Sequence, residues 1–156
     1  MAYNPETAIA YAHRWAKSRN PRYADFDPIG GDCTNFISQC LLAGGFEMNY
    51  TPVTGWFFNT LNSRSPSWSG VEELHKFIVT NQGNGVRGTD GGVSQVQPGD
   101  VIQLSFDGVT FEHSLFVVEE IAPDGDPLVC THTYDSDSRA LSSYSYARSR
   151  GILIAR

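Results

Sequence analysis

The sequence lacks an apolar run that approaches the roughly 18 residues expected of a membrane span. Its N-terminal segment also lacks the apolar stretch of a secretory signal. We therefore expect no membrane association, and either a cytoplasmic protein or one domain of a longer secreted chain. The length of 156 residues suits a single domain over residues 1–156, with enough chain to bury a core.

Basic charge and cysteine are also scarce. A formal net charge of −6 argues against a nucleic-acid partner held through phosphate contacts. There are three cysteines, and Cys33 and Cys40 lie two turns apart on one predicted helix. That spacing is about 10 Å, whereas a disulfide needs Cα atoms within about 7 Å. Neither a His-Glu-x-x-His motif nor a paired Cys-x-x-Cys motif occurs, so we expect no metal and no cofactor.

Helical periodicity and capping residues predict helices in the first half of the chain. Asn4 can cap the first helix, with Pro5 at its first position. Asp32 can cap the second, and Gly44-Gly45 ends it. The predicted helices begin at Pro5, span Cys33–Ala43, span Thr54–Leu61 as a short element, and run from the capping box Ser69–Glu72 through Val79.

The periodicity changes after residues 81–92, which are rich in glycine and asparagine and are typical of an exposed loop. Alternating apolar residues then predict strands, separated by Asp-Gly turns at residues 107–108 and 124–125. Helices followed by an antiparallel sheet indicate the α+β class. The predicted strands are Val101–Phe106, His113–Ile121, Leu128–Tyr134 and Gly151–Ala155.

The segment Gly30–Phe36 places Cys33 in the first turn of a helix, after a glycine-rich entry. Free backbone N–H groups and the positive end of the helix dipole favour the thiolate there, and the thiolate is the nucleophilic form. The same N–H groups could bind an oxyanion. The alternative is a small buried hydrophobic residue, which is our interpretation of Cys40 in mid-helix.

A nucleophilic thiol needs a base, and the best-placed histidine is His113, at the start of a strand. His13 and His75 lie on amphipathic helices and are expected to be partly exposed. A hairpin with the following strand would bring His132 and Asp135 near His113. Strand alternation favours His132 as the residue that hydrogen-bonds His113, with Asp135 as the alternative. His132 could instead be a hydrogen-bonded histidine of the sheet.

The stretch GDCTNFISQCLLAGG, residues 31–45, closely resembles the signature of the putative amidase domain family of bacterial proteins. That family is distantly similar to the NlpC-type and CHAP cell-wall peptidases. The resemblance covers nearly the whole chain. Its other matches are the leading helix, Tyr23, Trp56, Ser67-Trp68, Gln97–Ile102 and His113-Ser114.

The resemblance implies a papain-like cysteine hydrolase fold, with N-terminal helices packed on a C-terminal antiparallel sheet. It implies that Cys33 is the nucleophile and His113 the base, and it leaves the third position open between His132 and Asp135. The further candidates for oxyanion or substrate contacts are Tyr23, Asp32, Trp56 and Trp68. The alternative is that the tyrosine is a half-buried loop residue and both tryptophans belong to the core.

The leading hypothesis is a cysteine-dependent amide or peptide hydrolase that acts through a thioester acyl-enzyme. By resemblance, its substrates are peptidoglycan peptides or amides, and the chain is a domain of a secreted or cell-wall protein. One alternative is a non-catalytic module that binds peptidoglycan or peptide. Another is an acyltransferase or transglutaminase-like enzyme. We expect a monomer whose partner is its peptide or peptidoglycan substrate.

Overall fold

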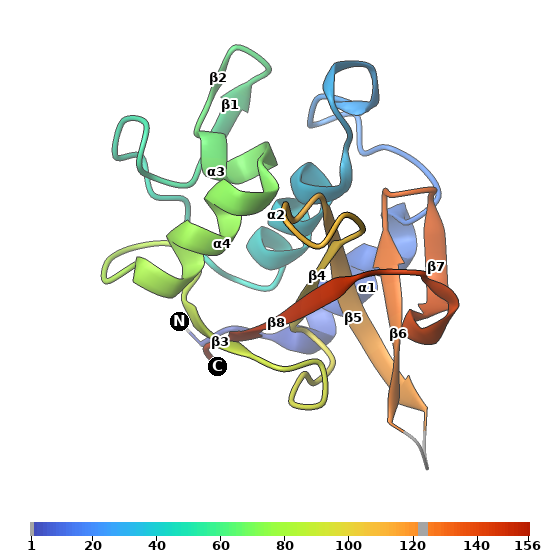
Figure 1. Cartoon of the computed structure of the whole chain (residues 1–156). Helices are drawn as coiled ribbons and strands as arrows, with labels where there is room; N and C mark the ends of the chain where they lie inside the picture. Colours follow the sequence, from blue (N-terminus) through green and yellow to red (C-terminus); the bar gives the residue numbers. More distant parts are fainter. Residues whose placement is uncertain (1, 122–124) are drawn as a thin grey trace.

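A computed structural model describes residues 2–121 and 125–156 of the chain (Figure 1). The first half is mostly helical and the second half is mostly strand. In chain order the elements are α1 (Pro5–Trp15), the 3-10 turn η1 (Asp27–Ile29), α2 (Cys33–Ala43), β1 (Phe58–Thr60), β2 (Ser63–Arg64), α3 (Pro66–Ser69), α4 (Val71–Thr80), β3 (Gly88–Gly91), β4 (Val101–Ser105), β5 (His113–Ile121), β6 (Asp126–Thr131), β7 (Ser136–Ala140), the 3-10 turn η2 (Leu141–Ser143) and β8 (Arg148–Ile154).

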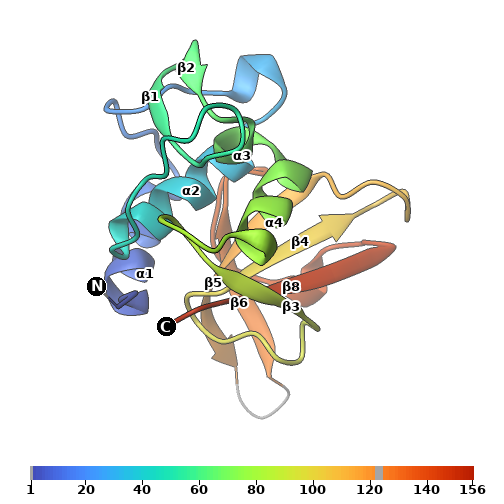
Figure 2. The same cartoon turned by 90° about the vertical axis from the view of Figure 1, so that its left-hand side faces the viewer.

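Six strands form one antiparallel sheet in the order β3-β8-β4-β5-β6-β7, and β1 and β2 form a separate hairpin. The helices lie on one side of the six-stranded sheet (Figure 2). The expected α+β class, with N-terminal helices packed against a C-terminal antiparallel sheet, is confirmed. None of the helices in the described part of the chain is both long and apolar enough to cross a membrane.

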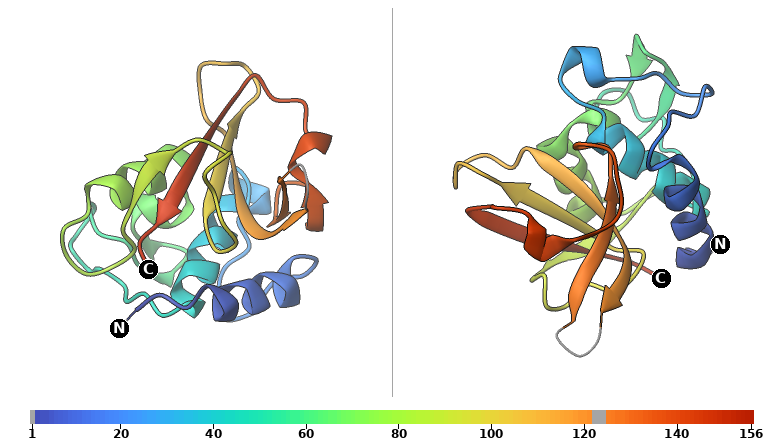
Figure 3. Two further views of the ribbon diagram at one scale, coloured as in Figure 1. Left: turned by 90° about the horizontal axis from the view of Figure 1, so that it is seen from below. Right: turned by 90° about the vertical axis from the view of Figure 1, so that its right-hand side faces the viewer.

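Helix α2 is the central element of the helical layer. Residues 33–41 are all buried, because α1 packs beside α2 and the strand β5 lies beneath it (Figure 3). Side chains alternate along β5. Phe116 joins the core that faces the helices, whereas Leu115 and Val117 join a second core on the far face of the sheet. Strand β5 is therefore buried on both sides.

Polar residues on α2 fix two tryptophans in this core. The Ser38 hydroxyl donates to the Trp68 carbonyl at 2.9 Å and accepts from Trp56 Nε1 at 3.0 Å. Asn35 Oδ1 accepts from Trp68 Nε1 at 2.9 Å. Both indole N–H groups are thereby satisfied, as buried tryptophans require.

The first two predicted helices are confirmed, with one difference in capping. Asn4 Oδ1 accepts a hydrogen bond from the Thr7 N–H at 3.2 Å, as expected of an N-cap. Asp32 precedes α2, but its side chain makes no capping hydrogen bond. The helix predicted from the capping box Ser69–Glu72 through Val79 is confirmed as α4, but it begins at Val71, because Gly70 has an extended backbone that separates α3 from α4. The capping box expected at Ser69 is therefore not formed.

Two predictions for loops and short elements are wrong. Residues 54–61 contain the strand β1 rather than a helix, because their backbone pairs with β2. Residues 81–92 are not wholly a loop, since their end forms β3 and pairs with β8. The sequence does not predict β7 either, because its residues are polar and lack apolar alternation. The turn expected at 124–125 lies partly outside the described residues.

We expect Ser38→Ala to lower the free energy of unfolding by about 1–3 kcal/mol, because a buried indole N–H and a buried carbonyl lose their partner. Urea denaturation followed by tryptophan fluorescence measures this. Ser94→Ala, at an exposed serine, serves as the control and should change stability by less than about 0.5 kcal/mol. Equal effects of the two substitutions would contradict the assignment of Ser38 to the core network.

Candidate active site

Cys33 is the first residue of α2 and lies against the start of β5. Its Sγ is 3.8 Å from Thr34 Oγ1 and 4.0 Å from the carbonyl oxygen of Glu112. The next residues of the helix and the strand are bonded to each other, because Thr34 Oγ1 lies 2.9 Å from Ser114 Oγ. This buried bond fixes the helix N-terminus, and the thiol with it, at the beginning of the strand.

His113 is the first residue of β5 and is half-buried on the side of the strand opposite α2. Its Nδ1 is 3.1 Å from Thr133 Oγ1, and its ring packs against Phe106 with centroids 4.7 Å apart. Within residues 2–121 and 125–156, Nε2 has no hydrogen-bond partner. Burial lowers the pKa of the His113 imidazole below its usual value, against the opposing charge of Glu112. The ring therefore stays neutral to lower pH than an exposed histidine.

Cys33 and His113 are near the same strand end but are not hydrogen-bonded among the described residues. Alternation explains this, because Ser114 faces α2 and His113 therefore projects toward the opposite side, as Leu115 does. The thiol lies at the strand end rather than over its middle, so only the beginning of β5 separates the two side chains.

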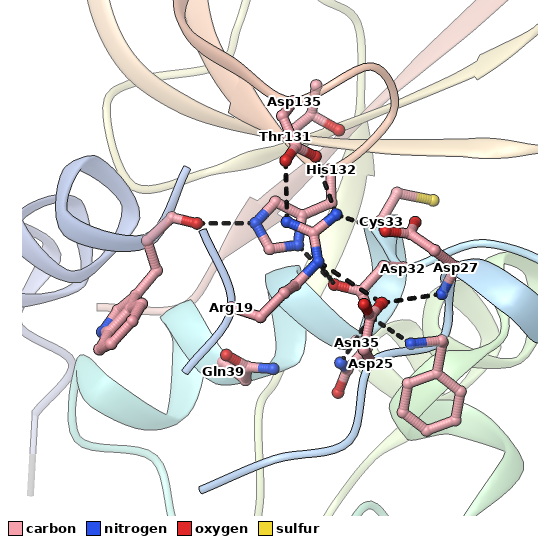
Figure 4. A network of polar contacts seen from close by, with 12 residues as sticks. Arg19, Asp25, Asp27, Asp32, Cys33, Asn35, Gln39, Thr131, His132 and Asp135 are labelled. Carbon is pink, nitrogen blue, oxygen red and sulfur yellow. Dashed lines mark hydrogen bonds and ion pairs between the residues drawn. The ribbon is translucent and has the colours of Figure 1, made fainter. Parts of the chain in front are cut away.

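His132 does not orient His113, and the predicted hydrogen bond between them is wrong. His132 Nδ1 lies 2.5 Å from Asp32 Oδ2, and Nε2 lies 2.7 Å from the carbonyl oxygen of Trp15 (Figure 4). Its ring stacks on Phe36 of α2, with centroids 4.1 Å apart. Both nitrogens are therefore occupied within this buried network, and neither is directed at Cys33 or His113.

Asp32 is the centre of this buried network. Its Oδ1 accepts from the Phe26 N–H at 2.8 Å and from Asn35 Nδ2 at 2.9 Å. Its Oδ2 pairs with His132 and lies 3.3 Å from Arg19 Nε. Because the carboxylate turns toward these groups, it leaves the first-turn N–H groups of α2 uncapped. Asp32, which was expected to cap α2, is thus the buried acceptor of this network. The Cys33 sulfur points away from its carboxylate (Figure 4).

Asp135, the alternative orienting residue, also binds elsewhere. Its two carboxylate oxygens accept from Arg19 Nη1 and Nη2, each at 2.9 Å. The fork of Arg19 thus joins Asp135 to Asp32 and to the exposed Asp27. From sequence, Arg19 is one of several charges near a helix end, and nothing in its spacing marks it as the partner of residues more than 100 positions away. Thr133 likewise carries no signal as the partner of His113.

Of the three aromatic substrate candidates, the two tryptophans belong to the core, whereas Tyr23 lies at its edge and lines a surface pocket. Trp56 and Trp68 are both 0% exposed, and their rings lie 5.2 Å apart. Tyr23 is half-buried, with its ring 5.9 Å from Trp68 and 5.6 Å from Phe58. Burial raises the pKa of its hydroxyl. In the described part of the chain, none of the three forms a hydrogen bond with Cys33.

A cleft of about 310 Å³ opens beside His113. Two of its residues, Phe106 and Thr133, are the ones that contact the imidazole. Its wall also contains an arginine, Arg139, whose guanidinium stacks on Tyr144 at 3.8 Å. The lining residues are Phe106, Thr133, Tyr134, Arg139, Ser143, Tyr144 and Ser145.

These features describe an α+β domain in which a cysteine begins a helix and a histidine begins the neighbouring strand. The chain matches the family described as "Putative amidase domain" over residues 2–155, and it belongs to that family. It is 37% identical over 141 residues to "Uncharacterized protein YhbB" of Bacillus subtilis (strain 168). The match covers 88% of this chain and 43% of the relative, so the chain spans less than half of that protein. No solved structure matches it significantly.

We expect iodoacetamide to modify Cys33 well before the other two cysteines. Cys40 and Cys130 are 0% exposed, against 8% for Cys33. Burial raises the pKa of Cys40 well above its usual value and that of Cys130 to about 12, so both remain thiols. Peptide mass mapping after brief labelling of the folded protein measures the three rates. Equal labelling of all three would remove the case for a distinct reactive thiol.

Proposed function

We propose that this domain is a cysteine-dependent amide hydrolase of papain-like architecture, with Cys33 as nucleophile and His113 as base. The observation that carries the proposal is the placement of Cys33 at the uncapped N-terminus of α2, beside the strand that begins with His113. Membership of the amidase family supports amide bonds as the target. The sequence pattern of the cysteine segment supports the same chemistry.

The choice of His113 as base follows from the contacts of the four histidines. His132 has acceptors on both nitrogens. His13 and His75 each pair with an aspartate, at 2.7 Å and 2.6 Å, away from Cys33. His113 alone, of the four, combines a free Nε2 with a position beside the Cys33 strand end.

A hydrogen bond from Nδ1–H to Thr133 Oγ1 leaves the lone pair on Nε2, which is the tautomer that a base needs. Because the side chains of His113 and Cys33 lie on opposite sides of β5 in the free protein, proton transfer requires the start of this strand to shift when substrate binds.

The reaction forms and cleaves one thioester. The imidazole takes the thiol proton, the sulfur attacks the amide carbonyl carbon, and the oxyanion is bound by backbone N–H groups of the α2 first turn. The C–N bond breaks as the imidazolium returns its proton to the leaving amine. Water then attacks the thioester, which releases the acid and restores the thiol.

The substrates that we propose are peptidoglycan peptides or amides, because the sequence resembles cell-wall peptidases. The cleft beside His113 suits the acyl side of such a substrate, since it combines an aromatic ring, Phe106, with hydroxyl groups and Arg139. A guanidinium there could pair with a carboxylate of the substrate.

The test is hydrolysis of purified peptidoglycan fragments, followed by mass spectrometry of products and of intact protein. Cys33→Ala should abolish both product release and the acyl-enzyme mass. His113→Gln should lower kcat/KM by at least about 100-fold, as loss of a general base does. The matched control is His75→Gln, which removes an aspartate-paired histidine elsewhere and should leave activity unchanged. Activity retained by Cys33→Ala would overturn the proposal, and an added amine that captures the acyl group would indicate transfer instead of hydrolysis.

We expect the acid limb of the kcat/KM profile to lie below the usual histidine pKa of about 6.5. The neutral imidazole is the active base, and burial lowers the pKa of His113, so activity should persist at mildly acidic pH and fall only below it. A profile of kcat/KM against pH between about 4 and 8, recorded at constant ionic strength, locates this acid limb. An acid limb above the ordinary histidine value would contradict a buried neutral base at position 113.

A further inference from the structure

A second group of reactive side chains lies away from Cys33, where α1 meets the strands β6 and β7. His13, Cys130 and Asp137 come from these three elements, and their ligand atoms all lie within 4.8 Å of one another. His13 Nδ1 is 2.7 Å from Asp137 Oδ1. Cys130 Sγ is 3.3 Å from Asp137 Oδ1 and 3.9 Å from His13 Nδ1. One nitrogen, one sulfur and one oxygen thus converge on one point.

We propose that His13, Cys130 and Asp137 bind a zinc ion, with water as the fourth ligand. The three separations define a point about 2.0 Å from each ligand atom, which is close to Zn–N and Zn–O bonds of about 2.0–2.2 Å and slightly short of a Zn–S bond of about 2.3 Å. Moving the ion slightly out of the plane of the three atoms lengthens all three distances. The imidazole and the carboxylate, now 2.7 Å apart, must separate slightly for tetrahedral angles at the ion, and both side chains are exposed enough to rotate.

The charge of the site also suits a divalent cation. A thiolate and a carboxylate supply two negative charges and a neutral imidazole supplies none, so Zn²⁺ leaves the site neutral. When zinc binds, the Cys130 thiol proton leaves to solvent and a Zn–S bond replaces the S–H donation to Asp137.

The backbone around Asp137 is shaped to complete this site. Pairing between β6 and β7 is irregular between Val129 and Thr131, so Cys130 lies at a bulge. Opposite it, Ser138 has φ 57°, in the left-handed region that a serine rarely adopts. In that conformation its hydroxyl donates to Asp137 Oδ1 at 3.0 Å. Such a hydrogen bond to a ligand is typical of metal sites.

The site is accessible from solvent on the His13 and Asp137 sides, whose side chains are 45% and 33% exposed. The sulfur is buried, which leaves one open direction for the water ligand. No sequence motif predicts the site, because Cys130 is 117 residues from His13 and 7 from Asp137. It thus departs from the expectation of no metal.

Cobalt is the spectroscopic probe for zinc at such a site, because a thiolate ligand gives an intense charge-transfer band. The Cys33→Ser protein, freed of metal with a chelator, lacks the most exposed of the three thiols. We expect it to bind one equivalent of Co²⁺ with that band, and Zn²⁺ to displace the cobalt. Saturating Zn²⁺ should raise Tm by about 5 °C or more, because a ligand of the native state stabilises it.

Variants at the two exposed ligands decide the outcome even if a substitution at buried Cys130 prevents folding. In the Cys33→Ser background, His13→Gln and Asp137→Asn should each weaken metal binding at least tenfold. Cys130→Ser should abolish the charge-transfer band. The matched control is His75→Gln, because His75 pairs with Asp90 at 2.6 Å without a cysteine. Absence of the band, or a band that His13→Gln leaves unchanged, would overturn the proposal.

Discussion

The buried carboxylate of Asp32 is the interaction on which the surroundings of Cys33 depend. It is 1% exposed, it accepts hydrogen bonds from a backbone N–H and an amide, and it pairs with His132 and Arg19. A buried charge is tolerated only when it is paired and hydrogen-bonded, so none of these partners can be removed without leaving another unsatisfied. Through them, the residue before the thiol is joined to the loop that follows α1 and to the end of β6.

This use of Asp32 has a chemical consequence for the helix that follows it. An N-cap side chain would bond the free N–H groups of the first turn, and those are the groups that an oxyanion needs. By turning to His132 and Arg19, the carboxylate stabilises the entry of α2 without occupying its N-terminus. The carboxyl group remains one residue from Cys33, but it is directed toward His132 and Arg19. The anchoring and the proposed catalytic chemistry therefore do not compete.

The local parts of this fold could be predicted from sequence. Asn4 and Pro5 mark the start of α1, and apolar alternation marks β4, β5 and β8. Strand β7 could not be predicted, because its polar residues are held by pairing with β6 rather than by their own propensity. The same limit applies to the site. Cys33 is recognisable from its local segment, whereas the partners of His132 are determined by contacts 100 and 117 residues away.

The error over His132 has a specific physical cause. Alternation correctly predicts that Cys130 and His132 face the helices, and both do. The prediction assumed that His113 faces the same way, but Ser114 takes the position toward α2 and His113 lies on the other side. The residue that hydrogen-bonds His113 is therefore Thr133, which follows His132.

Neighbouring residues at and just beyond the end of β6 thus contact different parts of the protein. Cys130 lies against His13 on α1, His132 bonds Trp15 at the end of the same helix, and Thr133 bonds His113. A zinc ion bound by Cys130 and His13 would hold the end of β6 against α1. The same helix supplies the Trp15 carbonyl, one of the two acceptors that contact His132. The other acceptor is Asp32, which precedes α2. The two hydrogen bonds of the His132 ring therefore connect α1, next to the proposed metal site, to the N-terminus of α2. The two proposed sites are then linked by rigid packing, although no residue belongs to both.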